Sequence, residues 1–327
     1  MSKKLWIIFA AIFLFHSGAF GQGLTRIVSG YSGLAGSHAI LWIGRDTGIF
    51  EKNGLKVEPV LLRSGPTHMQ ALIAGEIQMG QTGGPSVLAA GVAGADIVFL
   101  AVALNTPPNV LMGTVSRVEE LKGKAVGVTR YGSNTDFSAR FALRKFGLQP
   151  DKDVALIQLG DFQGIMGGIA TGRVAAGILA DPFTDHAAKL GYKELANVAN
   201  LGLEFPFVGI VTRKSYVRDQ PDAVRRYVRA YIESIALYIN NRELAAKVTG
   251  KYTGIQDPSI LASTVNFYAP KLSRAPYPTV GGIRVVLEQL AAQNPKAKTI
   301  DPETFMDVTF VKQLDDIGFI KSLYWGR

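Results

Sequence analysis

The apolar positions of residues 24–212 recur in turn at helical and at strand spacing, and one phrase of this pattern occurs twice. The phrase consists of the end of an apolar helix, a glycine, a charged residue and a short apolar stretch. It occupies residues 72–80 and, 97 positions later, residues 169–177. Gly75 and Gly172 suit the left-handed conformation that ends a helix. The repeat therefore predicts two helices that end in the same way.

The residues after each of these glycines alternate along the chain as the residues of a short strand do. We expect strands over residues 77–79 and 174–176. Gly80 and Gly177 follow these strands, and we expect both glycines to let the backbone turn near the strand's end.

The elements around the two copies also correspond in order. In each half an apolar run precedes a helix-like segment, a second apolar run and a second helix, which leads into the repeated phrase. The predicted strands lie at residues 27–28, 56–62 and 77–79 in the first half, and at residues 125–128, 154–159 and 174–176 in the second. Five elements in the same order predict two related α/β lobes, each with a largely parallel sheet.

The pattern changes beyond residue 220. Apolar residues recur at helical spacing from Val224 to Tyr238, behind an Asp-x-Pro start signal. Further helices fit residues 257–271, 279–292 and 302–314. A helical tail without strands must bury its apolar faces, and we expect it to pack on the first lobe.

Extended runs at residues 97–102, 110–115 and 207–212 indicate how the lobes are joined. We expect the chain to cross between the lobes twice, near residues 105–115 and 205–213. The predicted domains are lobe 1, residues 22–109 and 212–327, and lobe 2, residues 110–211.

The first 21 residues have the features of a secretory signal peptide. Lys3 and Lys4 give a positive start, residues 5–15 are apolar, and Ala19 and Gly21 fit a small-x-small cleavage site. The apolar segment is too short to cross a bilayer. Cleavage after Gly21 would release a periplasmic protein. The chain has no cysteine, which excludes disulfides, thiolate metal sites and a lipid-modified cysteine, so we do not expect a lipoprotein.

Charge and titratable residues exclude several functions. The net charge is +9, or +7 without Lys3 and Lys4, which is compatible with small anionic ligands. The basic residues are scattered and no nucleic-acid-binding motif occurs, so we predict no nucleic-acid partner. His38, His68 and His186 lack metal-ligand spacing, and neither a Gly-x-Ser-x-Gly motif nor a P-loop is found. We therefore predict a protein that is not an enzyme and has no cofactor.

Residues 70–83 read Gln-Ala-Leu-Ile-Ala-Gly-Glu-Ile-Gln-Met-Gly-Gln-Thr-Gly. This run resembles the signature of the nitrate/taurine/alkanesulfonate-type substrate-binding proteins of ABC importers. Shorter phrases match in the same order at residues 94–96, 121–124, 132–134, 145–148 and 181–183. The resemblance implies a periplasmic-binding-protein type II fold, in which two α/β lobes are joined by a two-crossing hinge and the helical tail packs on lobe 1. It also implies a small-molecule ligand, captured in the cleft by hinge closure and delivered to an ABC permease and ATPase.

The resemblance leaves the ligand open. The family includes binders of pyrimidine precursors of thiamine, so a pyrimidine or another heteroaromatic solute is the alternative to nitrate, taurine, another sulfonate or a carboxylate. The chain differs from the alkanesulfonate binders at residues 178–180, where they carry aromatic residues, and at Gly84, where they carry an acidic one.

Two other functions use the same fold. One is a solute sensor for a separate membrane receptor. The other is a pyrimidine synthase, whose motif contains a cysteine that this chain lacks. We expect a monomer.

Loops at the carboxyl ends of the predicted parallel strands supply the candidate ligand-binding residues, because ligands of such lobes bind there. The loops are rich in glycine and hydroxyl groups, whose donors bind an anionic oxygen without a full positive charge. The candidates are Tyr31, Ser32, Ser64, Gly65, Thr82, Gly83, Gly84, Ser86, Asn105, Arg130, Ser133, Asn134, Thr135, Asp161 and Asp181. The strongest group, Ser133 to Thr135, begins a helix, and its alternative role is that of an ordinary N-cap.

Overall fold

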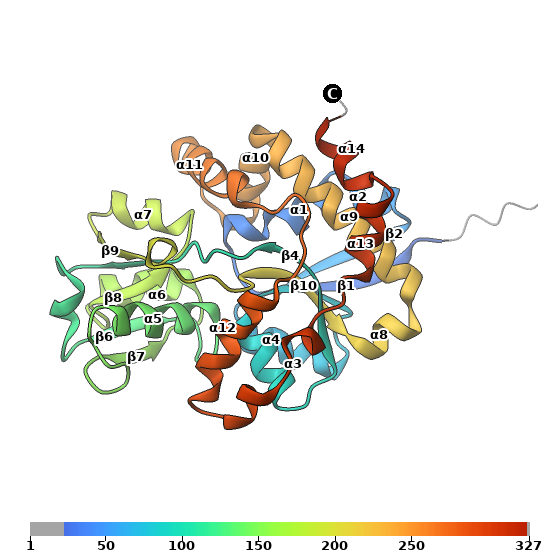
Figure 1. Ribbon diagram of the computed structural model, residues 1–327. Helices are drawn as coiled ribbons and strands as arrows, with labels where there is room; N and C mark the ends of the chain where they lie inside the picture. The colour runs from blue at the N-terminus through green and yellow to red at the C-terminus, as the bar shows by residue number, and fades with distance from the viewer. Residues whose placement is uncertain (1–22, 326–327) are drawn as a thin grey trace, which may run out of the picture.

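The computed structural model describes residues 23–325. The predicted signal peptide lies outside the described residues. The described chain forms two lobes side by side, each built on a five-stranded sheet with helices packed against it (Figure 1). The prediction of two α/β lobes is therefore confirmed.

The sheet of lobe 1 has the strand order β2-β1-β3-β10-β4. Its strands are β1 (Thr25–Tyr31), β2 (Leu55–Leu61), β3 (Met79–Thr82), β4 (Ile97–Leu104) and β10 (Val208–Arg213). β1 pairs in parallel with β2 and β3, whereas β10 is antiparallel to β3 and β4. β4 consists of apolar residues that are all buried, as expected of a strand covered on both faces.

The sheet of lobe 2 has the corresponding order β7-β6-β8-β5-β9. Its strands are β5 (Val110–Gly113), β6 (Ala125–Val128), β7 (Ala155–Gln158), β8 (Ala176–Leu179) and β9 (Lys193–Asn197). β6 pairs in parallel with β7 and β8, whereas β5 is antiparallel to β8 and β9. The repeat in the sequence thus extends to the topology of the two sheets.

Helices cover both sheets and form the C-terminal part of the chain. In lobe 1 they are the 3-10 helix η1 (Gly36–His38), α1 (Ala39–Asp46), α2 (Ile49–Lys52), α3 (Gly65–Ala74) and α4 (Gly84–Val92). In lobe 2 they are η2 (Val118–Leu121), α5 (Asn134–Lys145), α6 (Phe162–Ala170), α7 (Phe183–Lys189) and η3 (Val198–Leu201). The tail contains α8 (Lys214–Asp219), α9 (Pro221–Asn240), α10 (Arg242–Thr253), α11 (Pro258–Tyr268), η4 (Ala269–Lys271), α12 (Val280–Ala291), η5 (Pro295–Thr299), η6 (Pro302–Phe305), α13 (Thr309–Asp316) and α14 (Phe319–Trp325). Within residues 23–325, no helix has both the length and the apolar character that a membrane span needs.

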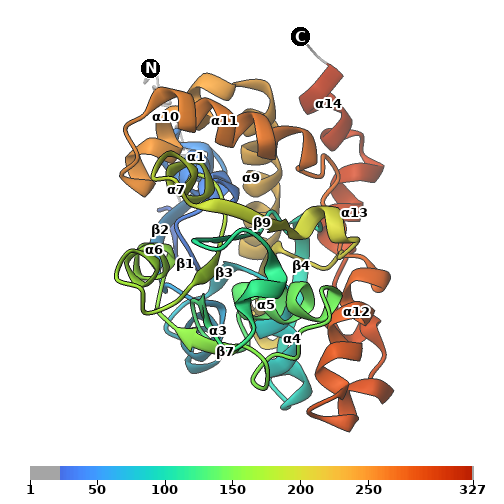
Figure 2. The same cartoon turned by 90° about the vertical axis from the view of Figure 1, so that its left-hand side faces the viewer.

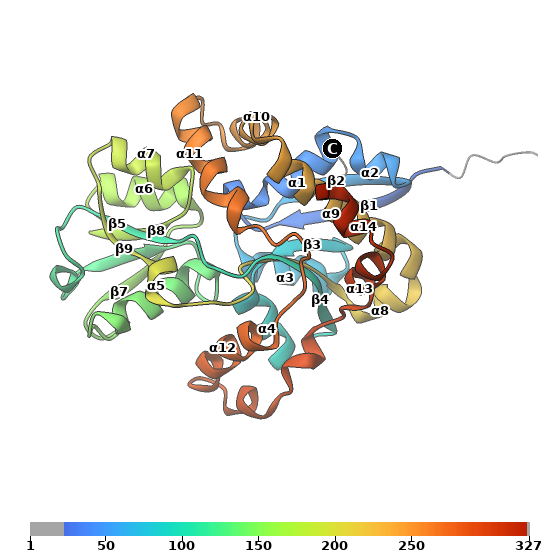
Figure 3. The same ribbon diagram turned by 45° about the horizontal axis from the view of Figure 1, so that its top comes forward.

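The chain changes lobe twice, and the strand after each crossing is the antiparallel strand of its sheet (Figure 3). The first crossing leads from β4 into β5, and the second leads into β10. The parallel strands end at the cleft, so a strand that enters from the cleft side runs in the opposite direction. The expected largely parallel sheets are therefore mixed, each with one antiparallel strand.

The second crossing also moves a predicted boundary. β10 pairs with β3 and β4 of lobe 1, so residues 208–211 lie in the sheet of lobe 1. The sequence analysis placed these residues in lobe 2. The extended run at residues 207–212 is visible in the sequence, but its pairing partners are not.

The repeated phrase folds differently from its prediction at the glycines that end it. β3 starts only at Met79 and β8 only at Ala176, so Gly80 and Gly177 lie inside strands and do not turn the chain. A Cβ atom at Gly80 would lie 1.9 Å from Nε2 of His68, and one at Gly177 would lie 2.2 Å from Cγ2 of Ile165. These glycines let α3 and α6 pack closely on their sheets.

The helical tail packs on lobe 1, as predicted (Figure 2). α9 contacts α1, α12 contacts α4, and α13 contacts β4. The single helix predicted over residues 302–314 is divided into η6 and α13. Between them, Met306 lies in an isolated bridge with Phe99 of β4, and the backbone N–H of Asp307 donates to the Phe99 carbonyl at 2.8 Å. Pairing with the sheet edge therefore interrupts the helix.

We expect Gly177→Ala to destabilise the protein and Gly167→Ala to stabilise it. The new methyl group at position 177 would collide with Ile165, which costs about 1–3 kcal/mol for an overpacked core. Gly167 is an exposed residue of α6 with open space around its Cβ position, so alanine there adds about 0.5–1 kcal/mol. Urea denaturation followed by circular dichroism measures both changes. Equal stability of the two variants would contradict the close packing of α6 on β8.

Candidate ligand-binding site

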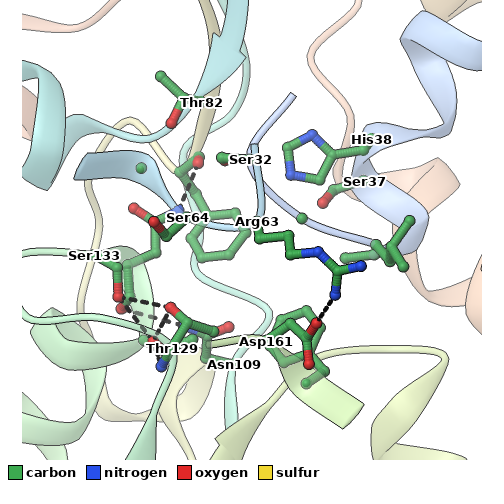
Figure 4. Close-up of a pocket in the computed structure, with 18 of the residues that line it drawn as sticks. Ser32, Ser37, His38, Arg63, Ser64, Thr82, Asn109, Thr129, Ser133 and Asp161 are labelled. Carbon is green, nitrogen blue, oxygen red and sulfur yellow. Dashed lines mark hydrogen bonds and ion pairs between the residues drawn. The ribbon is translucent and has the colours of Figure 1, made fainter. Parts of the chain in front are cut away.

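A cavity lies between the two lobes at the carboxyl ends of their parallel strands (Figure 4). Its cavity volume is about 50 Å³, and the empty space of about 590 Å³ in and around it includes open solvent. The lining residues of lobe 1 are Ser32, Gly33, Leu34, Ala35, Ser37, His38, Arg63, Ser64, Gly65 and Thr82. The crossings contribute Asn109 and Phe207, and lobe 2 contributes Thr129, Ser133, Asn134, Thr135, Asp161, Phe162 and Gln163.

Three helices begin at this cavity, one from lobe 1 and two from lobe 2. Ser64 caps α3 by accepting from the N–H of Thr67, and Ser133 caps α5 by accepting from the N–H of Asp136. Asp161 caps α6 in the same way. The positive ends of the three helix dipoles therefore point toward the same space, which favours a negatively charged or strongly polar group there.

Hydroxyl groups of lobe 2 form a cluster beside the start of α5. The Thr129, Ser133 and Thr135 hydroxyl oxygens lie 2.8–3.0 Å from one another. The backbone N–H of Thr129 donates to the Thr135 oxygen at 2.9 Å, which holds the cluster in place. Ser133 thus has both roles considered in the sequence analysis: it caps the helix and it lines the cavity.

Lobe 1 presents a buried hydroxyl group on the opposite side. Oγ1 of Thr82 is buried and has no hydrogen-bond partner among residues 23–325. Oδ1 of Asn109, in the first crossing, is also buried and unpaired within that part of the chain. Leaving such groups unpaired costs free energy, so both are suited to hydrogen bonds with a molecule in the cavity.

The titratable side chains of the lining leave the cavity close to neutral. Burial lowers the pKa of His38 to about 4, against a weaker opposing effect of its hydrogen bond to Gln81. His38 is therefore a neutral imidazole at pH 7, with one donor and one acceptor nitrogen. Arg63 and Asp161 form an ion pair across the cleft, and each offsets the charge of the other. The polar contacts available to a ligand consequently come from hydroxyl, amide, neutral imidazole and backbone groups.

Eight of the predicted site residues line the cavity. They are Ser32, Ser64, Gly65, Thr82, Ser133, Asn134, Thr135 and Asp161. They come from both halves of the repeat, and all lie at the end of a strand or the start of a helix. This is the location that the rule for parallel α/β lobes predicts.

Two predicted residues lie away from the cavity wall. Tyr31 is buried, and its ring packs edge-on against Trp42 with 5.5 Å between the ring centroids. Arg130 is exposed, directly after the lining residue Thr129. Each of the two residues is adjacent in the sequence to a lining residue, Ser32 or Thr129, but does not itself line the cavity.

Five other predicted residues also lie outside the lining, although most of them support contacts between the lobes or crossings. Gly83 and Gly84 approach neighbouring segments closely: a Cβ at Gly83 would lie 2.1 Å from Oδ1 of Asn134, and the N–H of Gly84 donates to Pro206 at 2.6 Å. The Ser86 hydroxyl donates to the backbone oxygen of Gly132 in lobe 2 at 2.8 Å.

Asn105 lies in the first crossing, where its backbone oxygen accepts from the N–H of Phe205 at 2.8 Å. Asp181 joins the lobes through its backbone oxygen, which accepts from the N–H of Gly36 at 3.0 Å. Burial, with the nearby Asp185 as a second cause, raises the pKa of the Asp181 carboxyl to about 7.

Several lining residues were missed by the sequence analysis, among them Ser37, His38, Arg63, Asn109, Thr129 and Phe207. Thr129 directly follows β6 and could have been found by the strand-end rule. Arg63 directly precedes the predicted Ser64. Asn109 and Phe207 lie in the crossings, where only the paired lobes show which residues face inward.

The sequence profile of the NMT1/THI5-like family matches residues 35–245, which is more than half of the chain. The chain belongs to this family. A Bacillus subtilis protein assigned as an aliphatic sulfonates-binding protein is 27% identical over 271 residues, covering 79% of each chain. The taurine-binding periplasmic protein of Escherichia coli is 26% identical over 207 residues, covering 62% of this chain and 63% of its own.

A solved structure shows the same fold as this NMT1/THI5-like chain. The alkanesulfonate-binding protein SsuA of Xanthomonas axonopodis pv. citri, bound to MOPS, superposes with a TM-score of 0.76 at 21% identity. The superposition covers 88% of this chain and 99% of that one. The predicted periplasmic-binding-protein fold and the resemblance to substrate-binding proteins are confirmed. The relatives named here are binding proteins, and the prediction that this chain is not an enzyme is confirmed as well.

We expect the His68→Ile variant to lose less stability than the parent as the pH is lowered below neutrality. Burial lowers the pKa of His68 to about 3, with a smaller contribution from His38. Below about pH 6.5 the unfolded chain binds a proton at His68 that the folded chain excludes. The free energy of unfolding therefore decreases as the pH is lowered, until the pKa of His68 in the folded chain is reached. Ile165 occupies the matching position of lobe 2, which makes isoleucine the natural replacement.

Melting temperatures of the parent and the His68→Ile variant, measured from pH 7 to pH 4, test this expectation. The slopes should differ by up to about 1.4 kcal/mol of stability per pH unit. Asp181 acts in the opposite direction, because its raised pKa stabilises the folded chain at low pH and that contribution is lost as the pH rises through about 7. Asp181 is present in both proteins, so comparison of the variant with its parent isolates His68. Parallel profiles would show that His68 is not buried as a neutral side chain.

Proposed function

We propose that this chain is the solute-binding component of an ABC importer and that it holds a small solute with an anionic oxygen group, such as a sulfonate, nitrate or carboxylate. The observation that carries the proposal is the convergence of uncharged donors from both lobes on one cavity. Hydroxyl groups and three helix N-termini surround the space, whereas Arg63 and Asp161, the charged side chains of the lining, are paired with each other.

An anionic oxygen is the group that best fits these donors. Hydrogen bonds to a charged acceptor are shorter and about twice as strong as bonds between neutral groups. The free N–H groups at the start of α3, α5 and α6 supply partial positive charge without the desolvation of a cationic side chain. Thr82 adds a buried donor that has no partner in the described chain.

Hinge closure would couple binding to the approach of the lobes. A ligand favours the closed form only if it binds that form better than the open one, so both lobes must contribute contacts. Lobe 1 offers Thr82 and Ser64, and lobe 2 offers the cluster around Ser133. Direct bonds between the lobes, such as the one from Ser86 to Gly132, add to the stability of the closed form.

The periplasmic location and the transport partners rest on other observations. The predicted signal peptide and the names of the relatives support a periplasmic protein that passes its solute to a membrane permease and its ATPase. The names of the relatives include aliphatic sulfonates and taurine, and both of these ligands carry a sulfonate group. The protein would act as a monomer.

A heteroaromatic solute such as a pyrimidine is the second candidate. The rings of His38, Phe162 and Phe207 line the cavity and offer surfaces on which a flat ring can pack. A thermal-shift screen with taurine, ethanesulfonate, nitrate, acetate and a hydroxymethylpyrimidine separates the two candidates. Stabilisation by the pyrimidine alone would replace the anionic solute with the heteroaromatic one, and no stabilisation by any compound would contradict both.

We expect Thr82→Val to weaken binding of the anion found in this screen by about tenfold or more, since a hydrogen bond to a charged group contributes about 1.5–3 kcal/mol. The melting temperature without ligand should not fall, because the lost hydroxyl group has no partner within residues 23–325. Isothermal titration calorimetry measures the affinity.

The matched control is Thr249→Val. The Thr249 hydroxyl group on α10 is also buried and unpaired in the described chain, but it does not line the cavity. This variant should bind like the parent. Unchanged affinity in Thr82→Val, or an equal loss in both variants, would contradict the proposed contact.

A further inference from the structure

The two lobes contain the same strand-to-helix turn, and the two copies differ at one informative position. Arg63 lies between β2 and α3, and Gly160 lies at the matching place between β7 and α6, 97 positions later. Both residues have a left-handed backbone, with φ of 50° at Arg63 and 87° at Gly160. The next residues, Ser64 and Asp161, cap the two helices. The turn therefore demands this conformation in both lobes.

Glycine adopts the left-handed conformation without steric cost, whereas arginine does not. Within residues 23–325, Arg63 and Asp151 are the non-glycine residues with positive φ. Gly160 in lobe 2 shows that glycine can occupy this position of the turn. An arginine held in strained backbone geometry next to a binding cavity points to a function of its side chain.

The Arg63 side chain reaches across the cleft to the other copy of the turn. Its Nη1 atom donates to Oδ2 of Asp161 (Figure 4). Oδ1 of Asp161 accepts from the N–H of Gly164 at 2.8 Å. Both residues line the cavity. The Arg63 side chain is 65% exposed and that of Asp161 is 21% exposed, so the pair lies where the cavity opens to solvent.

We infer that Arg63 and Asp161 form a clasp across the mouth of the cavity that holds the lobes together and slows the release of the bound solute. Lobe 1 supplies the arginine of the clasp. Lobe 2 supplies the aspartate, which is held in position because it also caps α6. Arg63 is a positioning residue, because it acts on the lobes and its charge is already paired. The effect on release rests on the proposed function, whereas the effect on the lobes does not.

The first experiment measures the distance between the lobes without ligand. The chain has no cysteine, so spin labels at Glu76→Cys and Lys152→Cys, both exposed, mark one site on each lobe. Double electron–electron resonance should measure longer distances between the two labels in Arg63→Gly than in the parent. Asp161→Asn keeps the cap of α6, since asparagine caps as well as aspartate, and should lengthen the distances similarly.

The double variant Arg63→Gly/Asp161→Asn should open the lobes no further than either single change, because one ion pair is lost in each case. Salt at 1 M should lengthen the distances more in the parent than in Arg63→Gly. The Arg63–Asp161 pair is exposed enough to be screened, whereas the exposed Lys189–Asp257 pair between α7 and the tail is present in both proteins. Identical distances in the parent and in Arg63→Gly would overturn the clasp.

The matched control is Asp151→Gly. Asp151 also has a positive φ, of 66°, but it pairs with Arg140 of its own lobe. This variant relieves a similar strain and should leave the distance between the lobes unchanged. The melting temperature of Arg63→Gly should stay close to that of the parent, which excludes a general loss of folding as the cause.

The second experiment measures release by stopped flow with ethanesulfonate as the probe. Dissociation from Arg63→Gly should be about two- to fivefold faster, as expected for the loss of one exposed ion pair. If Arg63→Gly releases the probe at the same rate as the parent but has longer distances between the lobes, the clasp holds the lobes together without slowing release. If ethanesulfonate does not bind the parent, the proposed sulfonate ligand fails, while the distances without ligand still decide whether the clasp exists.

Discussion

The site depends on the direction of the strands: the parallel strands of both sheets end at one shared cleft. The turns after β1, β2 and β3 in lobe 1 therefore face the turns after β6 and β7 in lobe 2. The two crossings preserve this arrangement, because each chain segment that enters from the cleft becomes the antiparallel strand of its sheet. Helix starts, with their unpaired N–H groups, are brought to the cleft for the same reason.

The chemistry of the cavity follows from what burial permits. An unpaired charge in a partly closed cleft is costly, and here the charges of Arg63 and Asp161 offset each other while His38 is kept neutral. The cost of binding is lower when the donors are hydroxyl and backbone groups already fixed by neighbouring bonds. The Thr129, Ser133 and Thr135 cluster is fixed in this way, so these groups need little reorganisation to meet a ligand.

The two lobes share one arrangement of strands and helices but differ in the side chains at matching positions. Glycine pairs beneath α3 and α6 occupy matching places, Gly30 beside Gly80 and Gly127 beside Gly177. The residues above them differ, however: lobe 1 has the buried His68 where lobe 2 has an isoleucine. The turn before each helix differs as well, because arginine replaces glycine in lobe 1. Lobe 1 thus has polar side chains, Arg63 and His68, at positions where lobe 2 has Gly160 and Ile165.

The sequence by itself determined the repeat, most elements of the two lobes and the N-cap at Ser133, because these depend on neighbours within a few residues along the chain. It also pointed to the strand ends that line the candidate cavity. Only the tertiary structure decided that Thr82 faces the cavity while Tyr31 packs in the core, that β10 belongs to lobe 1, and that Arg63 reaches Asp161. The pairing of β10 with β3 and the contact of Arg63 with Asp161 join residues about a hundred positions apart, and all of these contacts depend on how the elements pack in three dimensions.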